Sequence, residues 1–178
     1  MDRKLPDGIP QLSEYKSMLI SREFKLLEEF SNNFLHNNRK YLENYAKKWV
    51  KDPLHQWSRQ WEYPYVLRII QSVIKNLGNE RILDAGSGIT FFPYYIKSCY
   101  DNLDIHCCDL DSSLKDLFQI INRSTKEQVK FSCSDLSETP YEDNWFSIVY
   151  CISVLEHTDN YQNIIDEFSR IIKPGGKL

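Results

Sequence analysis

The chain has 178 residues, of which 42% are hydrophobic and 26% are charged, and its formal net charge is −3. This size and composition are typical of one soluble globular domain, and the small negative charge provides no overall positive field that would attract nucleic acid. No run of apolar residues approaches the ~20 needed to cross a bilayer, so we expect no membrane-spanning segment.

The cysteines indicate a reducing compartment. They are odd in number, include no Cys-x-x-Cys pair, and are Cys99, Cys107, Cys108, Cys133 and Cys151. The chain also starts without a signal-peptide pattern, so we expect a cytoplasmic protein. Cys107 and Cys108 lie in an apolar, strand-like run where free cysteines usually behave as small buried hydrophobes. Metal binding is the alternative for this pair, and we expect no metal site.

The N-terminal third is predicted to be an arm followed by helices. Residues 1–10 contain two prolines and a glycine, which favours a flexible arm. Apolar residues then recur at helical spacing across 12–50, which predicts two helices broken near 32–38. We interpret this aromatic stripe as packing against the main domain, with a lid or an oligomer surface as the alternative. Residues 1–63 are thus expected to form an arm and a helical cap.

The segment from His55 to Pro64 is unusually rich in aromatic and hydrogen-bonding side chains, which suggests a binding surface. His55, Trp57 and Trp61 could wall a substrate pocket or simply pack. Pro64 suits the first turn of a helix, and the apolar pattern that follows predicts that this helix runs until Gly78 stops it. We place a soft domain boundary at residue 64.

The remaining residues alternate between predicted strands and helices. After an apolar strand that ends near Asp84, the pattern predicts helices over 91–100, 113–122 and 161–172, and strands over 105–108, 129–133 and 146–152. The sequence Lys173-Pro174-Gly175-Gly176 is expected to end the last helix. Such alternation predicts an α/β fold, a Rossmann-like three-layer sandwich with a parallel central sheet.

The sequence Arg81-Ile82-Leu83-Asp84-Ala85-Gly86-Ser87-Gly88-Ile89-Thr90 indicates a nucleotide-binding turn between the first strand and the next helix. Glycine adopts backbone angles that crowd other residues, and it lets a ligand approach the main chain. Asp109 follows Gly88 by 21 positions, close to the roughly 20 expected for a carboxylate that binds a ribose. Asp111 is the competing candidate for that role, or it caps the next helix.

Five successive motifs resemble those of class I S-adenosylmethionine-dependent methyltransferases of the type 11 kind. They are Ile82 to Gly88, Asp109, Ser134-Asp135-Leu136, Val154-Leu155-Glu156-His157 and Ile172-Lys173-Pro174-Gly175-Gly176. Their order and spacing match the family, and the resemblance covers residues 64–178. It implies that this part binds S-adenosylmethionine and transfers its methyl group to an acceptor, for which we expect a small molecule and not nucleic acid.

The resemblance also implies a role for each motif residue. The methionine portion of the cofactor is lined by Asp84, Ala85, Gly86, Ser87, Gly88 and Cys151. Asp109 holds the ribose, Leu110 packs on the adenine, and Asp135 and the Leu136 amide bind the adenine edge. His157 is a weak candidate for a general base, and its structural role within the loop is the stronger interpretation. Arg59 and Tyr63 could reach the cofactor's carboxylate, or pack elsewhere.

The sequence departs from the family pattern in three places. Thr90 stands where many members have a third glycine, and Ser147 stands where many have an acidic residue. The chain also ends at Leu178, where the resemblance implies that a fifth strand only begins. We therefore expect strand 146–152 to be an exposed edge that a second chain or further residues of a longer protein would cover.

Two other functions compete with methyl transfer. The first is a module that binds the cofactor or a partner without turnover, because the C-terminal part of the fold is missing. The second is a nicotinamide-dependent dehydrogenase, which shares the glycine turn but gives no reason for Asp135-Leu136 or for the Pro-Gly-Gly element. Methyl transfer remains the main hypothesis.

Overall fold

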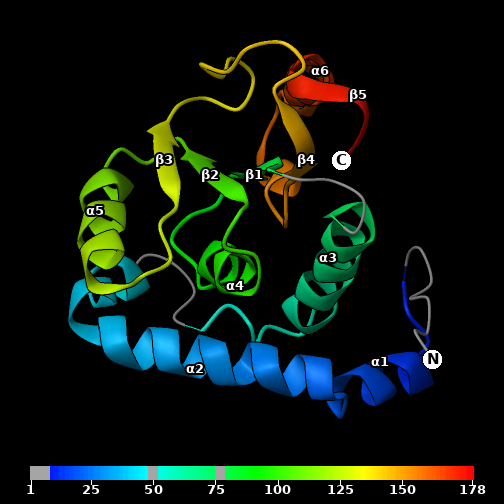
Figure 1. The fold of residues 1–178 in the computed structure, drawn as a ribbon, viewed down its shortest axis with the longest axis vertical. Helices are drawn as coiled ribbons and strands as arrows, with labels where there is room; N and C mark the ends of the chain where they lie inside the picture. Colours follow the sequence, from blue (N-terminus) through cyan, green and yellow to red (C-terminus); the bar gives the residue numbers. More distant parts are fainter. Residues whose placement is uncertain (1–8, 48–51, 75–78) are drawn as a thin grey trace. The chain divides into compact units, whose positions relative to one another are not determined.

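The computed structural model of the chain describes residues 9–47, 52–74 and 79–178 (Figure 1). Contacts divide these residues into two compact units, one ending at Ser72 and the other beginning at Val73. Within the described residues, no helix has the length and apolar character required to pass through a bilayer.

The first unit is helical. Its elements are α1 (Leu12–Leu19), α2 (Arg22–Leu42), the short 3-10 helix η1 (Tyr45–Lys47) and α3 (Arg59–Ile74), whose last two residues belong to the second unit. The helix break predicted near 32–38 is wrong, because α2 is continuous there. The interruption between helices lies instead between Leu19 and Arg22. Ser21 caps α2 by accepting a hydrogen bond from the Phe24 amide at 3.1 Å. Asn38 is accommodated within the helix because its side-chain amide donates to the Phe34 carbonyl at 2.9 Å.

The third helix also begins earlier than predicted. Pro64 lies inside α3, five residues after its start at Arg59, and the expected stop at Gly78 lies outside the described residues. Before this helix, the His55 ring is held by two carboxylates, with Nδ1 2.8 Å from Asp52 and Nε2 3.0 Å from Glu28. The hydrogen bond with Glu28 is the largest cause that raises the pKa of His55. This histidine therefore ties its loop to α2.

The second unit contains a five-stranded sheet in which every neighbouring pair of strands is parallel. Its strands are β1 (Arg81–Ala85), β2 (Asp104–Asp109), β3 (Lys130–Cys133), β4 (Phe146–Tyr150) and β5 (Ile172–Lys177). Their order across the sheet is β3-β2-β1-β4-β5. The predicted parallel sheet is confirmed.

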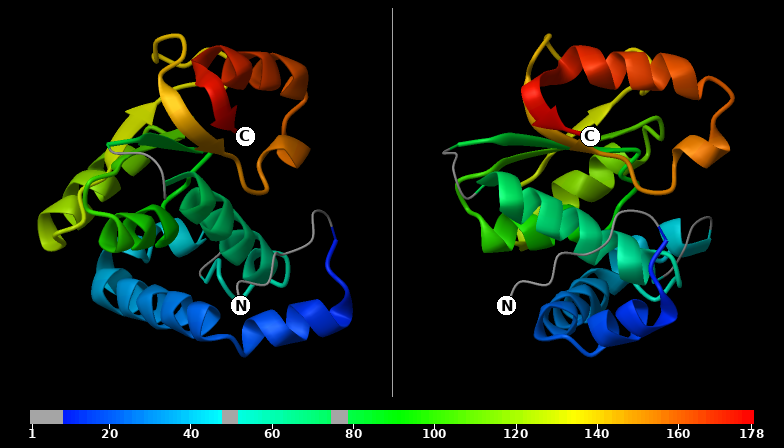
Figure 2. Two further views of the ribbon diagram at one scale, coloured as in Figure 1. Left: turned by 45° about the vertical axis from the view of Figure 1, so that its right-hand side comes forward. Right: turned by 90° about the vertical axis from the view of Figure 1, so that its right-hand side faces the viewer.

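Helices cover both faces of this sheet. The elements are α4 (Phe92–Cys99), α5 (Leu114–Ser124), the 3-10 helix η2 (Leu155–His157) and α6 (Tyr161–Ile171). Figure 2 shows α6 on one face and α4 with α5 on the other. On the α5 side, the Phe118 ring stacks on Phe131 of β3 at 4.6 Å between ring centres. On the opposite face, Phe168 of α6 is fully buried in a cluster with Leu83 and Ala85 of β1. The three-layer α/β sandwich is thus confirmed.

The strand after α6 differs from expectation. β5 begins at Ile172, directly after the helix, and includes the Lys173-to-Gly176 segment that we expected only to end it. It pairs with β4 through Phe146 and Ile172, so β4 is not an edge of the sheet. Proline and glycine are tolerated here because, among the described strands, β5 is itself an edge.

Candidate functional site

The strand order reverses at β1, which has β2 on one side and β4 on the other. In open parallel sheets, ligands bind beyond the carboxyl ends of the strands at such a point. The glycine turn begins there, directly after β1. Gly86 and Gly88 have φ angles of 71° and 51°, in the left-handed region that side chains disfavour. These angles explain why glycine occupies both positions.

Hydrogen bonds tie the glycine turn to the end of β2. The amides of Gly86 and Ser87 donate to the Cys108 carbonyl at 2.8 and 3.1 Å. The Gly88 amide donates to Oδ2 of Asp109 at 2.8 Å. The 21-residue spacing noted in the sequence therefore corresponds to a direct contact, made possible because β1 and β2 are parallel neighbours.

Val154, which follows β4, packs against the same turn. A methyl group built on Gly86 would lie 2.5 Å from one Val154 side-chain carbon, closer than side chains approach one another. Position 86 thus requires glycine both for its positive φ angle and because Val154 leaves no room for a side chain. The sequence motif included Val154, but its spacing gave no sign of this contact. The turn is enclosed by β2 on one side and the loop after β4 on the other.

Asp109 retains the capacity to bind a ligand. Its Oδ1 accepts the Asp111 amide at 3.0 Å and its Oδ2 accepts Gly88, which leaves acceptor capacity on both oxygens. Asp111 instead accepts from the amide and hydroxyl of Ser113, at 2.9 and 2.6 Å, just before α5. Ser113 is itself the N-cap of α5, so these bonds close a turn before the helix and do not make Asp111 its cap. The exposed side chain of Leu110 lies between the two aspartates in the sequence.

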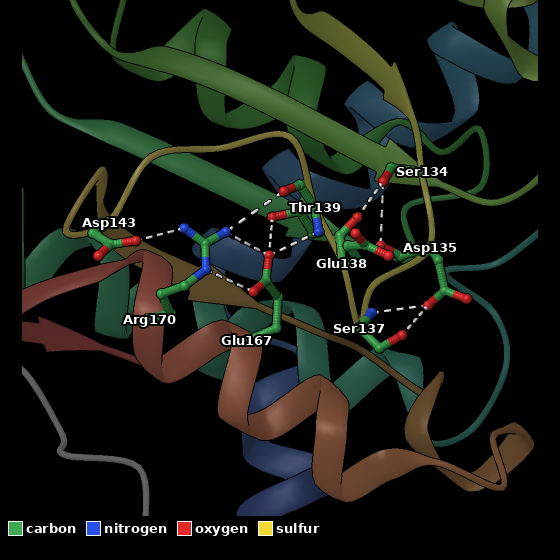
Figure 3. Close-up of polar contacts among 8 residues, drawn as sticks. All are labelled: Ser134, Asp135, Ser137, Glu138, Thr139, Asp143, Glu167 and Arg170. Carbon is green, nitrogen blue, oxygen red and sulfur yellow. Dashed lines mark hydrogen bonds and ion pairs between the residues drawn. The ribbon is translucent and has the colours of Figure 1, made fainter.

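Asp135 has one oxygen committed and one available. Its Oδ1 accepts the amide and the hydroxyl of Ser137, each at 2.8 Å, whereas the other oxygen points away from these groups (Figure 3). The backbone bond from Ser137 is the largest cause that lowers the pKa of Asp135, so the carboxylate stays ionised. The Leu136 side chain is buried in the core cluster, so only the main chain of this residue is proposed to contact a ligand.

Asp84 is a buried carboxyl group, 6% exposed, at the end of β1. Burial raises its pKa to about 8, a hydrogen bond from Tyr150 opposes that rise, and the charge of Asp109 adds to it. None of these groups is a cation, so a positively charged ligand beside Asp84 would stabilise its ionised form. Tyr150 was not identified from the sequence, because only the register of β1 with β4 places it beside Asp84.

Cys151 and His157 show no catalytic constellation. Burial, followed by the charges of Asp84 and Glu156, raises the pKa of Cys151 to about 12, so its thiol is protonated at neutral pH. His157 ends η2 with an exposed side chain, and its amide donates to the Val154 carbonyl at 2.9 Å. The loop role of His157 therefore has a contact to support it. Arg59 belongs to the first unit, where it pairs with Glu62 at 2.8 Å.

The Ser147 departure is compensated by a neighbouring carboxylate. Its hydroxyl donates to Glu80, which precedes β1, and accepts from the Lys173 ammonium at 3.2 Å. Glu80 and Lys173 also form an ion pair at 3.2 Å. This cluster lies at the amino ends of the strands, so the substitution leaves the candidate site at their carboxyl ends untouched.

A sequence model of a protein family, described as "Methyltransferase domain", matches residues 83–178. The chain belongs to this methyltransferase family. An uncharacterized protein of Methanocaldococcus jannaschii is 29% identical over 146 residues, which are 74% of this chain and 59% of that protein. Phosphoethanolamine N-methyltransferase 1 of Triticum aestivum is 27% identical over 101 residues, 56% of this chain and 20% of that protein. The chain thus spans between a fifth and three fifths of these relatives.

Solved structures agree on the fold. Phosphoethanolamine N-methyltransferase 2 of Haemonchus contortus, solved in complex with S-adenosyl-L-methionine, has a TM-score of 0.53 and 24% identity over 62% of this chain and 26% of that chain. Together with the family match, this likeness shows the class I methyltransferase fold, and S-adenosyl-L-methionine is the cofactor that the nematode structure contains.

The residues at the carboxyl ends of the strands fit this cofactor. It carries a ribose diol, an adenine amino group and two positive charges, and the chain offers acceptors on Asp109 and Asp135 and the buried carboxyl group of Asp84. When bound, the cofactor supplies a methyl group on a sulfonium. The chain's own groups would bind and orient it, and no described contact assigns a nucleophile or a base.

Proposed function

We propose that the protein binds S-adenosylmethionine at the carboxyl ends of β1, β2 and β3 and transfers its methyl group to a small-molecule acceptor. The observation that carries this proposal is the 2.8 Å hydrogen bond from the Gly88 amide to Asp109. It joins the turn that would face the methionine portion to the carboxylate that would hold the ribose. We assign the adenine edge to Asp135 and the Leu136 amide, and the adenine face to Leu110.

In this proposal, positioning provides most of the catalysis. Methyl transfer from a sulfonium is an in-line displacement, so the protein must align the acceptor with the methyl group and exclude water. Asp84 and Tyr150 would hold the positively charged end of the cofactor from within the sheet. A base is needed only for a weak acceptor, and the exposed side chain of His157 is the group to test for that role.

The acceptor proposed is a small organic molecule. The net charge of −3 disfavours a polyanion such as RNA. The wheat and nematode relatives are named phosphoethanolamine N-methyltransferases, so phosphoethanolamine is the first acceptor to test. We also propose a cytoplasmic location, because all five cysteines are free thiols.

Two substitutions on opposite ends of β2 test cofactor binding. Asp109→Ala removes the proposed ribose acceptor, whereas Asp104→Ala removes a carboxylate that pairs with Lys130 at 2.8 Å at the other end of the strand. Titration calorimetry should show that Asp109→Ala loses on the order of 1–3 kcal/mol of binding free energy for S-adenosylhomocysteine. Asp104→Ala should bind like the wild type. Unchanged affinity in a folded Asp109→Ala protein would overturn the ribose assignment.

Turnover is measured separately from binding. The wild-type chain is incubated with S-adenosylmethionine labelled on its methyl group, with phosphoethanolamine and then with a fractionated metabolite extract. Labelled product that disappears in Asp109→Ala would support the enzyme. Tight binding with no labelled product from either source would instead favour a cofactor-binding module without turnover.

A further inference from the structure

The loop that carries the proposed adenine-binding residues is fastened to a helix distant in sequence. This loop joins β3 to β4 over residues 134–145 and has no helix of its own. Its fastening point is Glu167 of α6, whose side chain is buried, with 9% exposed. Oε1 of Glu167 accepts both the amide and the hydroxyl of Thr139, at 2.7 and 2.6 Å (Figure 3).

Arg170, one turn along α6, completes the fastening. Its Nε and Nη2 donate to the two oxygens of Glu167 at 2.8 and 2.7 Å, so the carboxylate is held on both sides. Its Nη1 donates to Asp143, near the far end of the loop, at 2.7 Å. The hydrogen bond from Arg170 is the largest cause that lowers the pKa of Glu167 to about 2. Glu167 therefore remains an acceptor at any working pH.

The turn between Ser134 and Thr139 is itself closed by hydrogen bonds. The Ser134 hydroxyl donates to the Glu138 carbonyl at 2.9 Å, and the Glu138 amide donates to the Asp135 carbonyl at 3.2 Å. Ser137 donates twice to Oδ1 of Asp135. Because the turn is internally braced, fixing Thr139 also fixes Asp135 and Leu136, which precede it by four and three residues.

We propose that Glu167, held by Arg170, is a positioning residue for adenine recognition: it sets the place of the turn that presents Asp135 and the Leu136 amide. The inference rests on the proposed function, because it assumes that these two groups contact the adenine. Glu167 itself touches no ligand in this account. It acts through Thr139, and its effect is on which base the site prefers.

The test compares two ligands that differ only in the base. Hypoxanthine lacks the amino group that would donate to Asp135, and its N1 carries a proton that would oppose the Leu136 amide. Wild-type protein should therefore bind S-adenosylhomocysteine more tightly than S-inosylhomocysteine. Glu167→Gln should weaken the affinity for S-adenosylhomocysteine about 2- to 10-fold, which corresponds to one misplaced hydrogen bond. Its affinity for S-inosylhomocysteine should stay within about twofold of the wild-type value.

A second variant and a matched control keep the test decisive. Thr139→Val removes the hydroxyl donor but leaves the Glu167–Arg170 pair, so it should narrow the same preference even if Glu167→Gln fails to fold. Asp143→Asn alters the exposed end of the network, where the Asp143 side chain is 71% exposed, and should leave the preference unchanged. The rate of hydrogen exchange of the 134–139 amides should rise in Glu167→Gln and Thr139→Val but not in Asp143→Asn.

Two results would overturn the inference. An equal loss of affinity for both ligands would mean that Glu167 only stabilises the fold. An unchanged preference for S-adenosylhomocysteine in both Glu167→Gln and Thr139→Val would mean that other contacts place the turn. Failure of the proposed function gives a different result, since wild-type protein would then bind neither ligand.

Discussion

The two ends of the central sheet treat their carboxylates in opposite ways. At the amino ends, Glu80 pairs with Lys173 at 3.2 Å, and Asp104 pairs with Lys130 at 2.8 Å. At the carboxyl ends, Asp84 and Asp109 have a tyrosine hydroxyl and backbone amides as partners, and no ion pair within the described residues. Lysines neutralise the carboxylates at the amino ends, whereas no described cation does so at the carboxyl ends, where burial keeps Asp84 protonated at neutral pH and a cationic cofactor would bind. The comparison separates carboxylates that stabilise the fold through ion pairs from those proposed to bind the cofactor.

The largest expected effect is a loss of folding stability on substitution of Gly86, at the carboxyl end of β1. Gly86→Ala should lower the free energy of unfolding by about 2–5 kcal/mol, because it combines left-handed strain with overpacking against Val154. Gly175→Ala is the matched control, since φ there is 82° but no atom lies within 4 Å of the added methyl. It should cost only the strain, about 1–2 kcal/mol. Urea denaturation measures both.

A double variant isolates the packing contribution to that cost. In a Val154→Ala background, the loss caused by Gly86→Ala should fall toward that of Gly175→Ala. An unchanged loss would show that backbone strain alone excludes a side chain at position 86.

The next effect concerns pH. The pKa of Asp84 is about 8 in the folded protein against an ordinary 3.8, so the folded state binds the extra proton between these values. Stability contributed by this group therefore falls as pH rises through the window, by at most about 1.4 kcal/mol per pH unit. Asp84→Asn cannot ionise, so its stability relative to the wild type should rise from pH 5.5 to 8.5. A constant difference across that range would contradict the assignment.

Cofactor binding should report the same group. A positive charge placed near Asp84 favours its ionised form, so binding S-adenosylmethionine at pH 7 should release up to about one proton. Calorimetry in two buffers of different ionisation enthalpy measures the number released. Asp84→Asn is the control, and equal proton release from both proteins would assign the proton to another group.

The smallest effect is expected at the amino ends. Lys173→Met removes the cation beside Glu80, and because the lysine side chain is 38% exposed, it should cost less than about 1 kcal/mol of stability. Affinity for S-adenosylhomocysteine should not change. A loss of affinity comparable to that of Asp109→Ala would erase the proposed contrast between the two ends.

Local sequence signals predicted the strand and the turn around which the candidate site is built. The apolar strand before two glycines predicted the strand and the turn that the structure contains, and the aspartate 21 residues later, predicted to bind a ribose, contacts that turn at Gly88. This succeeded because a tight turn and two adjacent parallel strands are determined by residues close together in the chain. The cofactor roles of Leu110, Cys151 and the other motif residues stay predictions.

Other features depended on contacts that sequence spacing does not reveal. Glu167 and Thr139 are 28 residues apart, and no periodicity marks them as partners. The helix break was placed at asparagines of low helix propensity, whereas Ser21 supplied the cap that starts α2. β5 was expected to begin only at the end of the chain, because proline and glycine disfavour strands, but pairing along β4 overrides that preference from Ile172 onward.

The thiol of Cys133 is a point for chemical labelling on the proposed adenine side of the site. It is exposed at the end of β3, and its sulfur lies 3.5 Å from the carbonyl oxygen of Leu110. Cys107 and Cys108 are fully buried, so a water-soluble maleimide would not reach them, and replacing the exposed Cys99 with serine removes the main competitor. A fluorophore attached to Cys133 would lie beside the proposed nucleoside site, so its fluorescence would report whether the cofactor is bound.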